Sequence, residues 1–262
     1  MATEIESTEY TGLFTVLYDL LHDGAPEADA YVALARELGG TLLELGSGTG
    51  RLVLPLARAG CEVWGLDLYA DMQAACRRKL AREPEAVRAR VTLVAGDARA
   101  FSLPRTFRLI TAPCNFLDNL LEADDLARTF RCVARHLDED GLFVIDSSAP
   151  DVPTMVATHG KEQVGEFTHP ETGHRLVSRF TPRFDFVRQV ETDEILVEEH
   201  AGERLIRRAR TTMTVTWHHP RELEGALVAA GLEVEGVFGS VDRRPLRHRG
   251  GDVVLVARHP RP

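Results

Sequence analysis

Residues 41–51 read Thr-Leu-Leu-Glu-Leu-Gly-Ser-Gly-Thr-Gly-Arg, and this stretch decides the fold. The mainly apolar run 41–45 is typical of a buried strand, and three glycines follow it at alternate positions. Glycine adopts the backbone angles of a tight turn and lets the backbone approach a ligand without a Cβ in the way. Residues 50–59 carry a helical pattern, whose first N–H groups would face that ligand. The stretch predicts a strand, a ligand-binding loop and a helix.

The spacing of the glycines distinguishes two kinds of nucleotide loop. A dinucleotide-binding loop has the pattern Gly-x-Gly-x-x-Gly, which would require glycine at position 51. The chain has Arg51 there, and its third glycine comes one residue earlier, at Gly50. Counted from Glu44, the pattern is Glu-x-Gly-x-Gly-x-Gly.

Short apolar runs alternate with helical patterns on both sides of this loop. The further strands predicted up to residue 150 are 62–67, 90–94, 108–112 and 142–146. The predicted helices are 27–38, 50–59, 70–83 and 122–137. Strands that are apolar along their whole length and alternate with helices indicate a parallel sheet covered on both faces. We therefore expect an α/β fold with a doubly wound, Rossmann-like sheet of seven mostly parallel strands, which binds ligands at the carboxyl ends of its strands.

The pattern changes after Asp151. Residues 151–173 read as an irregular connection, and 174–182, 185–199 and 203–217 then alternate apolar and polar residues, with Gly202 at a hairpin turn. Such alternation predicts an inserted antiparallel β block with one covered face. A helix at 220–230 and strands at 232–238 and 253–257 would return to the main sheet. The expected organisation is 1–173 for N-terminal lid helices and the core, 174–219 for the insert, and 220–262 for the returning elements.

Composition excludes several classes of protein. The 262 residues carry a net charge of −9, which argues against a nucleic-acid partner. No apolar run approaches the ~20 residues that span a membrane. The four cysteines form no Cys-x-x-Cys pair, the histidines show no metal-ligand spacing, and no signal-like segment begins the chain, so we expect a cytoplasmic protein with reduced cysteines and no metal.

The glycine loop, together with the residues that follow the next strands, resembles class I S-adenosylmethionine-dependent methyltransferases. The resemblance covers nearly the whole chain. It implies that Asp67 bonds the ribose hydroxyls, that Met72 packs on the adenine, and that Asp97 accepts from the adenine amine. The cofactor-binding residues that the resemblance implies are Tyr18, Glu44, Gly46, Ser47, Gly48, Gly50, Arg51, Asp67, Leu68, Met72, Gly96, Asp97, Ala98, Pro113 and Asn115.

Two further motifs resemble a narrower branch, the aminosugar N-methyltransferases of antibiotic biosynthesis. They are Tyr18-Asp19-Leu20-Leu21-His22-Asp23-Gly24 and Gly239-Ser240-Val241-Asp242-Arg243-Arg244-Pro245-Leu246. In that branch a Tyr and a His lie near the acceptor, and His22 and Asn119 stand at those positions here. Asn119 can orient a substrate but takes no proton at neutral pH. The resemblance therefore leaves His22 as the first candidate for a general base, and Asp118 as a weaker one.

The departure at these two positions leaves the acceptor open: an aminosugar, another amine, or an aromatic carbon such as an indole. We expect one face of strand 203–217 to cover it. Arg210 and Thr212 lie on one side of this strand, and Met213 and Trp217 on the other. The candidate substrate-binding residues are Phe116, Asp118, Arg210, Thr212 and Trp217.

Methyl transfer from a sulfonium is a direct displacement, so the enzyme mainly aligns the reactants and excludes water. The sequence thus predicts a methyltransferase that uses S-adenosyl-L-methionine, releases S-adenosyl-L-homocysteine, and acts as a monomer or homodimer on a small-molecule acceptor of bacterial natural-product biosynthesis. The alternatives are a non-catalytic S-adenosylmethionine-binding regulator or scaffold and an NAD-dependent oxidoreductase.

Overall fold

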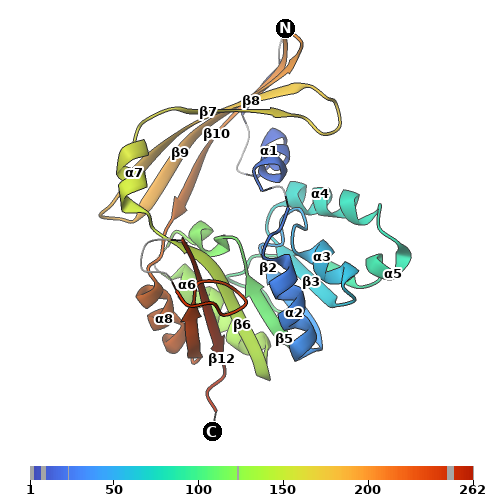
Figure 1. Cartoon of the computed structure of the whole chain (residues 1–262), viewed down its shortest axis with the longest axis vertical. Helices are drawn as coiled ribbons and strands as arrows, with labels where there is room; N and C mark the ends of the chain where they lie inside the picture. The colour runs from blue at the N-terminus through green and yellow to red at the C-terminus, as the bar shows by residue number, and fades with distance from the viewer. Residues whose placement is uncertain (1–2, 7–9, 23, 123, 247–250, 262) are drawn as a thin grey trace. The chain divides into compact units, whose positions relative to one another are not determined.

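The computed structural model describes residues 3–6, 10–22, 24–122, 124–246 and 251–261, so Asp23 of the N-terminal motif lies outside the described residues. The chain forms two compact units, both built from separate stretches (Figure 1). Residues 24–150 and 217–262 make up one, which we call the Rossmann unit. Residues 1–23 and 151–216 make up the other, which we call the β unit. The strand that ends near residue 150 and the helix that starts near residue 220 thus belong to one unit.

The Rossmann unit contains a seven-stranded sheet in the order β11-β12-β6-β5-β2-β3-β4. Its strands are β2 (Thr41–Leu45), β3 (Glu62–Asp67), β4 (Val91–Ala95), β5 (Phe107–Ala112), β6 (Leu137–Ala149), β11 (Glu233–Phe238) and β12 (Gly251–Arg258). Strands β4, β3, β2, β5 and β6 pair in parallel, whereas β12 and β11 pair antiparallel. The predicted Rossmann-like sheet of mostly parallel strands is confirmed.

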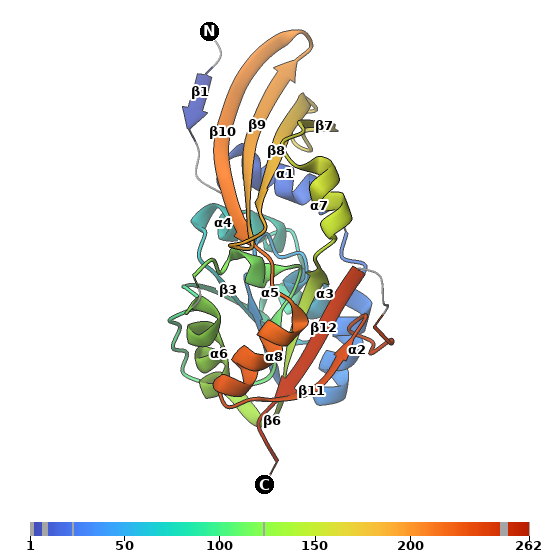
Figure 2. The same ribbon diagram turned by 90° about the vertical axis from the view of Figure 1, so that its left-hand side faces the viewer.

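Helices cover both faces of this sheet because successive side chains of its strands point to opposite sides. The helices are α2 (Ala28–Leu38), α3 (Val53–Arg58), α4 (Ala70–Leu80), α5 (Glu85–Arg88), the 3₁₀ helix η1 (Phe116–Asn119), α6 (Asp125–His136) and α8 (Pro220–Ala229). Leu43 and Ile110 pack on one face with Phe130 of α6 and Leu227 of α8. Helices α6 and α8 lie side by side on this face (Figure 2). Leu42 and Leu109 belong to the opposite core, which includes residues of α2 and α3. The sheet is therefore doubly wound.

The β unit contains a five-stranded sheet in the order β1-β10-β9-β8-β7. Its elements are β1 (Thr3–Glu6), α1 (Leu13–Leu21), α7 (Val152–Thr158), β7 (Gln163–Thr168), β8 (Arg175–Asp185), β9 (Val190–Ala201) and β10 (Arg204–Thr216). The strands β7, β8, β9 and β10 form an antiparallel meander, and Gly202 makes the turn between β9 and β10 with a φ of +61°. Helix α1 packs on this sheet through Leu13, Phe14 and Leu17 (Figure 2).

Two features of the β unit differ from the prediction. Residues 151–173 are not an irregular connection, because they contain α7 and β7. Asp151 begins α7 by accepting hydrogen bonds from Thr154, and β7 pairs along its whole length with β8. The antiparallel sheet also includes β1, which pairs in parallel with β10. The second sheet therefore includes two strands, β1 and β7, that precede residue 174, where the predicted insert begins.

Among the described residues, we find no helix with the length and apolar character that crossing a membrane requires. All four cysteines are free thiols, and burial raises the pKa of the Cys76 thiol to about 12.

Candidate functional site

The strand order of the Rossmann unit reverses between β2 and β5. The chain continues from β2 outward to β3 and β4, and then returns to β5 and β6 on the other side of β2. The carboxyl ends of two strands at such a reversal flank a crevice, which is the usual ligand site of open α/β sheets. The loop after β2 (residues 46–52) and the loop after β5 (residues 113–115) lie at this position, so the glycine loop and the predicted cofactor residues Pro113 and Asn115 come to the same edge of the sheet.

The loop after β2 needs glycine at three positions, each with a positive φ. The φ angles are +67° at Gly46, +54° at Gly48 and +85° at Gly50. A Cβ on Gly46 would lie 2.1 Å from Cδ2 of Phe116, and one on Gly50 would lie 2.6 Å from Sγ of Cys76. At Gly48 the nearest atom would be Cε of Met72, at 3.4 Å. Packing within the protein thus requires glycine at 46 and 50, whereas Gly48 has space beside it and only its backbone angle favours glycine.

The helix after this loop begins later than the sequence predicts. Helix α3 starts at Val53 and has six residues. The loop takes the residues before it, held by hydrogen bonds from the Ser47 N–H to the Leu66 carbonyl (3.0 Å) and from the Gly50 N–H to the Ser47 carbonyl (2.9 Å). The N–H groups at the crevice therefore belong to the loop and not to a long helix.

Asp67 ends β3 beside this loop, and its carboxylate holds two backbone segments. One oxygen accepts from the Gly48 N–H at 2.7 Å and the other from the Tyr69 N–H at 2.8 Å. Burial raises the pKa of Asp67, and the two hydrogen bonds oppose that shift. Each carboxylate oxygen has a second lone pair, so Asp67 can hold the loop and still accept from two hydroxyl groups of a ligand.

A group of acidic and phenolic side chains lies behind the glycine loop. Glu44 and Tyr31 are buried, and neither Oε2 of Glu44 nor the Tyr31 hydroxyl has a hydrogen-bond partner among the described residues. Burial raises the pKa of Glu44, and the charge of Arg51 counteracts this shift. Arg51 itself pairs with Glu27. Buried polar atoms normally have partners, so the unpaired Glu44 oxygen is evidence for a hydrogen-bonding or cationic ligand at this end of the crevice.

Asp146 of β6 adjoins the same group and makes the stability of the protein depend on pH. Burial, followed by the charges of Glu27 and Asp252, raises its pKa from the ordinary 3.8 to about 7. The folded state therefore binds more protons between these pH values, and the free energy of unfolding falls as pH rises from about 4 to about 7.

We expect Asp146→Asn to be more stable than wild type by roughly 1 to 3 kcal/mol at pH 8 and nearly equal to it near pH 4. Urea unfolding at both pH values measures this, and a difference independent of pH would contradict it.

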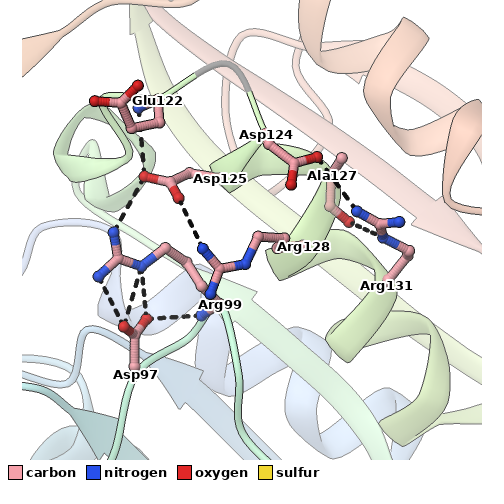
Figure 3. Close-up of polar contacts among 8 residues, drawn as sticks. All are labelled: Asp97, Arg99, Glu122, Asp124, Asp125, Ala127, Arg128 and Arg131. Carbon is pink, nitrogen blue, oxygen red and sulfur yellow. Dashed lines mark hydrogen bonds and ion pairs between the residues drawn. The ribbon is translucent and has the colours of Figure 1, made fainter.

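On the side of β4, the Asp97 carboxylate is held by Arg99 in a network that the sequence does not predict (Figure 3). Arg99 donates to Asp97 from Nε (2.9 Å), Nη2 (2.7 Å) and its backbone N–H (2.9 Å), and these bonds lower the pKa of Asp97. Arg99 also donates to the buried Asp125 at the start of α6, at 3.1 Å, and Arg128 pairs with Asp125 at 3.6 Å. The network fixes the loop after β4 with Asp97 ionised, so Asp97 remains able to accept a further hydrogen bond.

The loop after β5 has an unusual backbone. Cys114 and Asn115 both adopt left-handed angles, with φ of +53° and +55°, which non-glycine residues rarely do and which concentrate at functional sites. The Asn115 N–H donates to the Asp146 carbonyl at 3.0 Å, whereas its side-chain oxygen is buried without a partner among the described residues. Phe116 follows, and its ring lies against Gly46. The loops after β2 and β5 are therefore in contact.

The candidate catalytic and substrate-binding residues are distributed over both units. In the Rossmann unit, Asn119 ends η1 and donates to the Phe116 carbonyl at 3.0 Å, Asp118 lies beside it, and Trp217 is buried. In the β unit, His22 stacks on Tyr18 at 4.3 Å and bonds the Tyr18 carbonyl through Nδ1 at 2.9 Å. A carbonyl only accepts, so Nδ1 carries the proton and Nε2 of the neutral ring can take one.

Arg210 and Thr212 lie on the face of the β-unit sheet opposite to α1. They pair with Leu196 and Glu194 of β9, whereas α1 packs on the face that carries Val197 and Ala209. The structure thus brings together the predicted cofactor residues in and beside the loops after β2, β3 and β5. It leaves Tyr18, His22, Arg210 and Thr212 in the other unit.

Comparisons with known proteins agree with this geometry. Residues 42–141 match a family model described as a methyltransferase domain. The chain is 30% identical over 256 residues to the dTDP-3-amino-3,6-dideoxy-alpha-D-glucopyranose N,N-dimethyltransferase of Streptomyces fradiae, covering 94% of this chain and 93% of the relative. The sugar N-methyltransferase KedS8 from Streptoalloteichus sp ATCC 53650 has the same fold, with a TM-score of 0.77, 22% identity, and coverage of 100% of this chain and 98% of that one.

A further solved structure is the glycopeptide N-methyltransferase MtfA complexed with S-adenosyl-L-methionine. It matches with a TM-score of 0.60 and 26% identity, covering 91% of this chain and 96% of that one. The likeness spans both units, and the glycine loop, Asp67 and the reversal of strand order lie where the sequence predicts them. The chain belongs to the S-adenosylmethionine-dependent methyltransferases.

Proposed function

We propose that this methyltransferase acts on an amine nitrogen of a small natural-product intermediate, with nucleotide-linked aminosugars as the first class of acceptor to test. The observation that carries the proposal is the extent of the match to the dTDP-aminosugar N,N-dimethyltransferase, which covers 94% of this chain and so includes the β unit. The glycopeptide relative also methylates nitrogen, according to its name. Amine nitrogen is therefore favoured over an aromatic carbon, the other acceptor that the sequence leaves open.

The residues of the crevice fit S-adenosylmethionine. The unpaired oxygens of Glu44 and Asn115 are acceptors that a cationic, amine-bearing ligand can satisfy, and Gly48 has space beside its backbone. Asp67 retains lone pairs for ribose hydroxyls, and Met72 and the buried Ala98 are apolar partners for an adenine ring. When bound, the cofactor supplies a methyl group on a sulfonium, whose sulfur is a good leaving group because it departs as a neutral thioether. We therefore propose that turnover needs no metal, and added chelator is expected to leave it unchanged.

The residues of this chain would then align the acceptor, exclude water and manage one proton. A neutral amine attacks the methyl carbon with its lone pair, and the nitrogen loses a proton once the new bond has formed. An amine with a pKa near neutrality can release that proton to solvent, whereas a more basic amine gains from a positioned base. We propose His22 as that base, acting through Nε2, since Nδ1 is committed to the Tyr18 carbonyl. Asn119 would orient the acceptor.

Replacing His22 by phenylalanine tests this assignment. The variant keeps a ring to stack on Tyr18 but removes the proton-accepting nitrogen. We expect kcat to fall by about 10- to 100-fold while the affinity for S-adenosylhomocysteine stays within about twofold. Steady-state kinetics on a methylated acceptor and calorimetry measure the two quantities. Wild-type turnover would remove His22 from the reaction.

The function itself is tested by mass spectrometry. Purified protein and S-adenosylmethionine are incubated with dTDP-aminosugars, their hydroxyl counterparts, short peptides with a free N-terminus, and indoles. We expect the mass of one or two methyl groups on an amine and none on the matched hydroxyl compound. Methylation of an indole carbon would overturn the amine assignment. Cofactor binding with no methylated compound in the panel would instead favour the non-catalytic binder.

We further infer that the protein works in the cytoplasm as a monomer or homodimer, on a dissolved acceptor and not on nucleic acid or membrane. The net charge of −9 disfavours binding to polyanions. Four free thiols suit a reducing compartment. We also propose that the inserted sheet supplies residues for the acceptor, because this is the part of the chain that the cofactor loops do not use.

A further inference from the structure

One face of the β-unit sheet carries two adjacent carboxyl groups among apolar side chains. This face, which we call the α1 face, contains Leu176, Val197 and Ala209, and helix α1 packs on it there. Residues that pair across antiparallel strands share a face, and residues two apart on one strand do as well. By the register of β9, Glu191 and Asp193 lie on the α1 face, beyond the part that these three residues form.

The two carboxyl groups form a hydrogen-bonded pair. The side chains of Glu191 and Asp193 are hydrogen-bonded to each other. Asp193 is only 6% exposed, and its Oδ1 atom is buried without a hydrogen-bond partner among the described residues. A buried carboxylate oxygen without a partner costs free energy. The unpartnered Oδ1 atom therefore indicates a hydrogen-bond donor that comes from a ligand. This observation is separate from the hydrogen bond between the two carboxyl groups.

The neighbours of the pair do not supply that donor. The cross-strand neighbours are Pro182 and Phe184 on β8 and Met213 and Val215 on β10, and their side chains carry no donor group. Phe184 is 6.0 Å from Phe186, centroid to centroid. The two carboxyl groups thus face a largely apolar and aromatic environment.

Other acids on the same strand are treated differently. Glu199 is also on the α1 face and is 2% exposed, but Arg207 and His174 both donate to it. Glu198, on the opposite face, is paired with Arg208. Cations of the chain thus neutralise Glu198 and Glu199, whereas no cation pairs with Glu191 or Asp193 among the described residues.

The protonation of the pair agrees with this description. Burial, together with the charge of Asp193, raises the pKa of Glu191 to about 7, and burial raises that of Asp193 to about 6. Two carboxyl groups in contact titrate as one system, so near neutral pH the pair holds a shared proton. A cationic donor in the site would replace that proton, which would pass to solvent.

We propose that Glu191 and Asp193 bind the ammonium group of the amine acceptor and take one proton from it, so that the nitrogen regains its lone pair before it attacks the methyl group. An ammonium offers several N–H donors and one positive charge, which match the unpartnered oxygen of Asp193 and the net charge of the pair. A hydroxyl in the same place would bring a donor without the charge, so the pair selects amines over alcohols. The inference rests on the proposed function as an N-methyltransferase, since it assigns the residues that recognise its substrate class.

The first test needs no turnover. Side-chain carboxyl carbons are labelled with carbon-13, and the signals of Glu191 and Asp193 are followed by NMR at one neutral pH while methylammonium chloride is added. Tetramethylammonium, which has the charge but no N–H donor, is the matched probe. We expect saturable shifts with methylammonium at a Kd at least about tenfold lower than with tetramethylammonium, a difference of about 1.4 kcal/mol. Equal responses to the two cations, or none, would overturn the proposal.

The second test uses variants and an amine that the mass-spectrometric screen finds to be methylated. Asp193→Asn and Glu191→Gln keep the size of each side chain and remove its charge. Both are expected to raise the KM for the amine at least about tenfold and to leave the affinity for S-adenosylhomocysteine unchanged. The control is Glu194→Gln, which lies on the opposite face of β9 and only approaches Arg183 at 3.8 Å. It should behave as wild type.

The outcomes separate this inference from the proposed function. Methylation of an amine with wild-type KM in both folded variants would leave the function standing and overturn the role of the pair. Methylammonium binding at the pair, with no amine methylated in the screen, would keep the ammonium site and overturn the function. Loss of S-adenosylhomocysteine affinity in a variant would mark it as misfolded, and the NMR measurement on the wild-type protein then decides.

Discussion

Gly46→Ala is expected to lower the free energy of unfolding by roughly 2 to 5 kcal/mol and to abolish measurable binding of S-adenosylhomocysteine. Two costs add up at this position. An alanine at a φ of +67° is strained, and its Cβ would lie 2.1 Å from Cδ2 and 2.7 Å from Cε2 of Phe116. To relieve the contact the ring or the loop must move, and either movement deforms the crevice between β2 and β5. Urea unfolding and calorimetry measure the two losses.

Two further variants separate strain from collision. Gly60, in the loop before β3, has a φ of +96° and nothing within 4 Å of an added Cβ. Gly60→Ala should therefore lose about 1 to 2 kcal/mol from backbone strain and retain its affinity for S-adenosylhomocysteine. Phe116→Ala in the Gly46→Ala background should recover part of the lost stability, because the ring is removed. If Gly46→Ala binds S-adenosylhomocysteine as wild type does, the contact between the two loops has no role in the site.

Asp67→Ala should weaken the binding of S-adenosylhomocysteine at least tenfold, a loss of about 1.4 kcal/mol or more. Removing the carboxylate takes away the acceptors proposed for the ribose hydroxyls. It also leaves the N–H groups of Gly48 and Tyr69 without the partners that now lie at 2.7 and 2.8 Å. The loop after β2 would then lose its tie to β3, so the loss is expected in both the affinity and the free energy of unfolding.

Glu62→Gln is the matched control for this variant. Glu62 begins the same strand that Asp67 ends, and it bonds Arg105 and Thr41 at the opposite edge of the sheet. Its replacement should leave the affinity unchanged. Calorimetry with S-adenosylhomocysteine compares the three proteins, and an affinity of Asp67→Ala equal to that of the control would exclude Asp67 from the ribose site.

Local signals predict the parallel strands and loops of the Rossmann unit, because these signals lie in short stretches of sequence. The run 41–51 contains both the strand and the glycines that the loop requires. An aspartate lies at or just after the end of each of the next two strands, Asp67 and Asp97. The hydrogen bonds of Arg99 could not be predicted in this way, because Asp125 lies far along the chain and no spacing rule connects a loop arginine to a helix start. Only the fold brings them together.

The β unit is harder to predict for a different reason. Residues 163–168 have a glycine at the centre and only two apolar side chains, so their strand character comes from pairing with β8 and not from their own pattern. Alternation along 185–199 correctly separates two faces, but it cannot say which face is covered. Glu191 and Asp193 are acids on a face that elsewhere packs against α1, and a pattern of polarity alone assigns such residues to solvent.

The pairing of β1 with β10 also determines the order in which the protein can fold as it leaves the ribosome. Thr3 pairs with Arg207, so β1 is synthesised long before the strand with which it pairs. Contacts between such distant segments slow folding, because a large loop must close before they are made. Until then the apolar side of α1, with Leu13, Phe14 and Leu17, has no sheet to cover it. Helix α1 therefore stays uncovered during synthesis until β8, β9 and β10 have been made, and exposed apolar side chains of this kind favour aggregation.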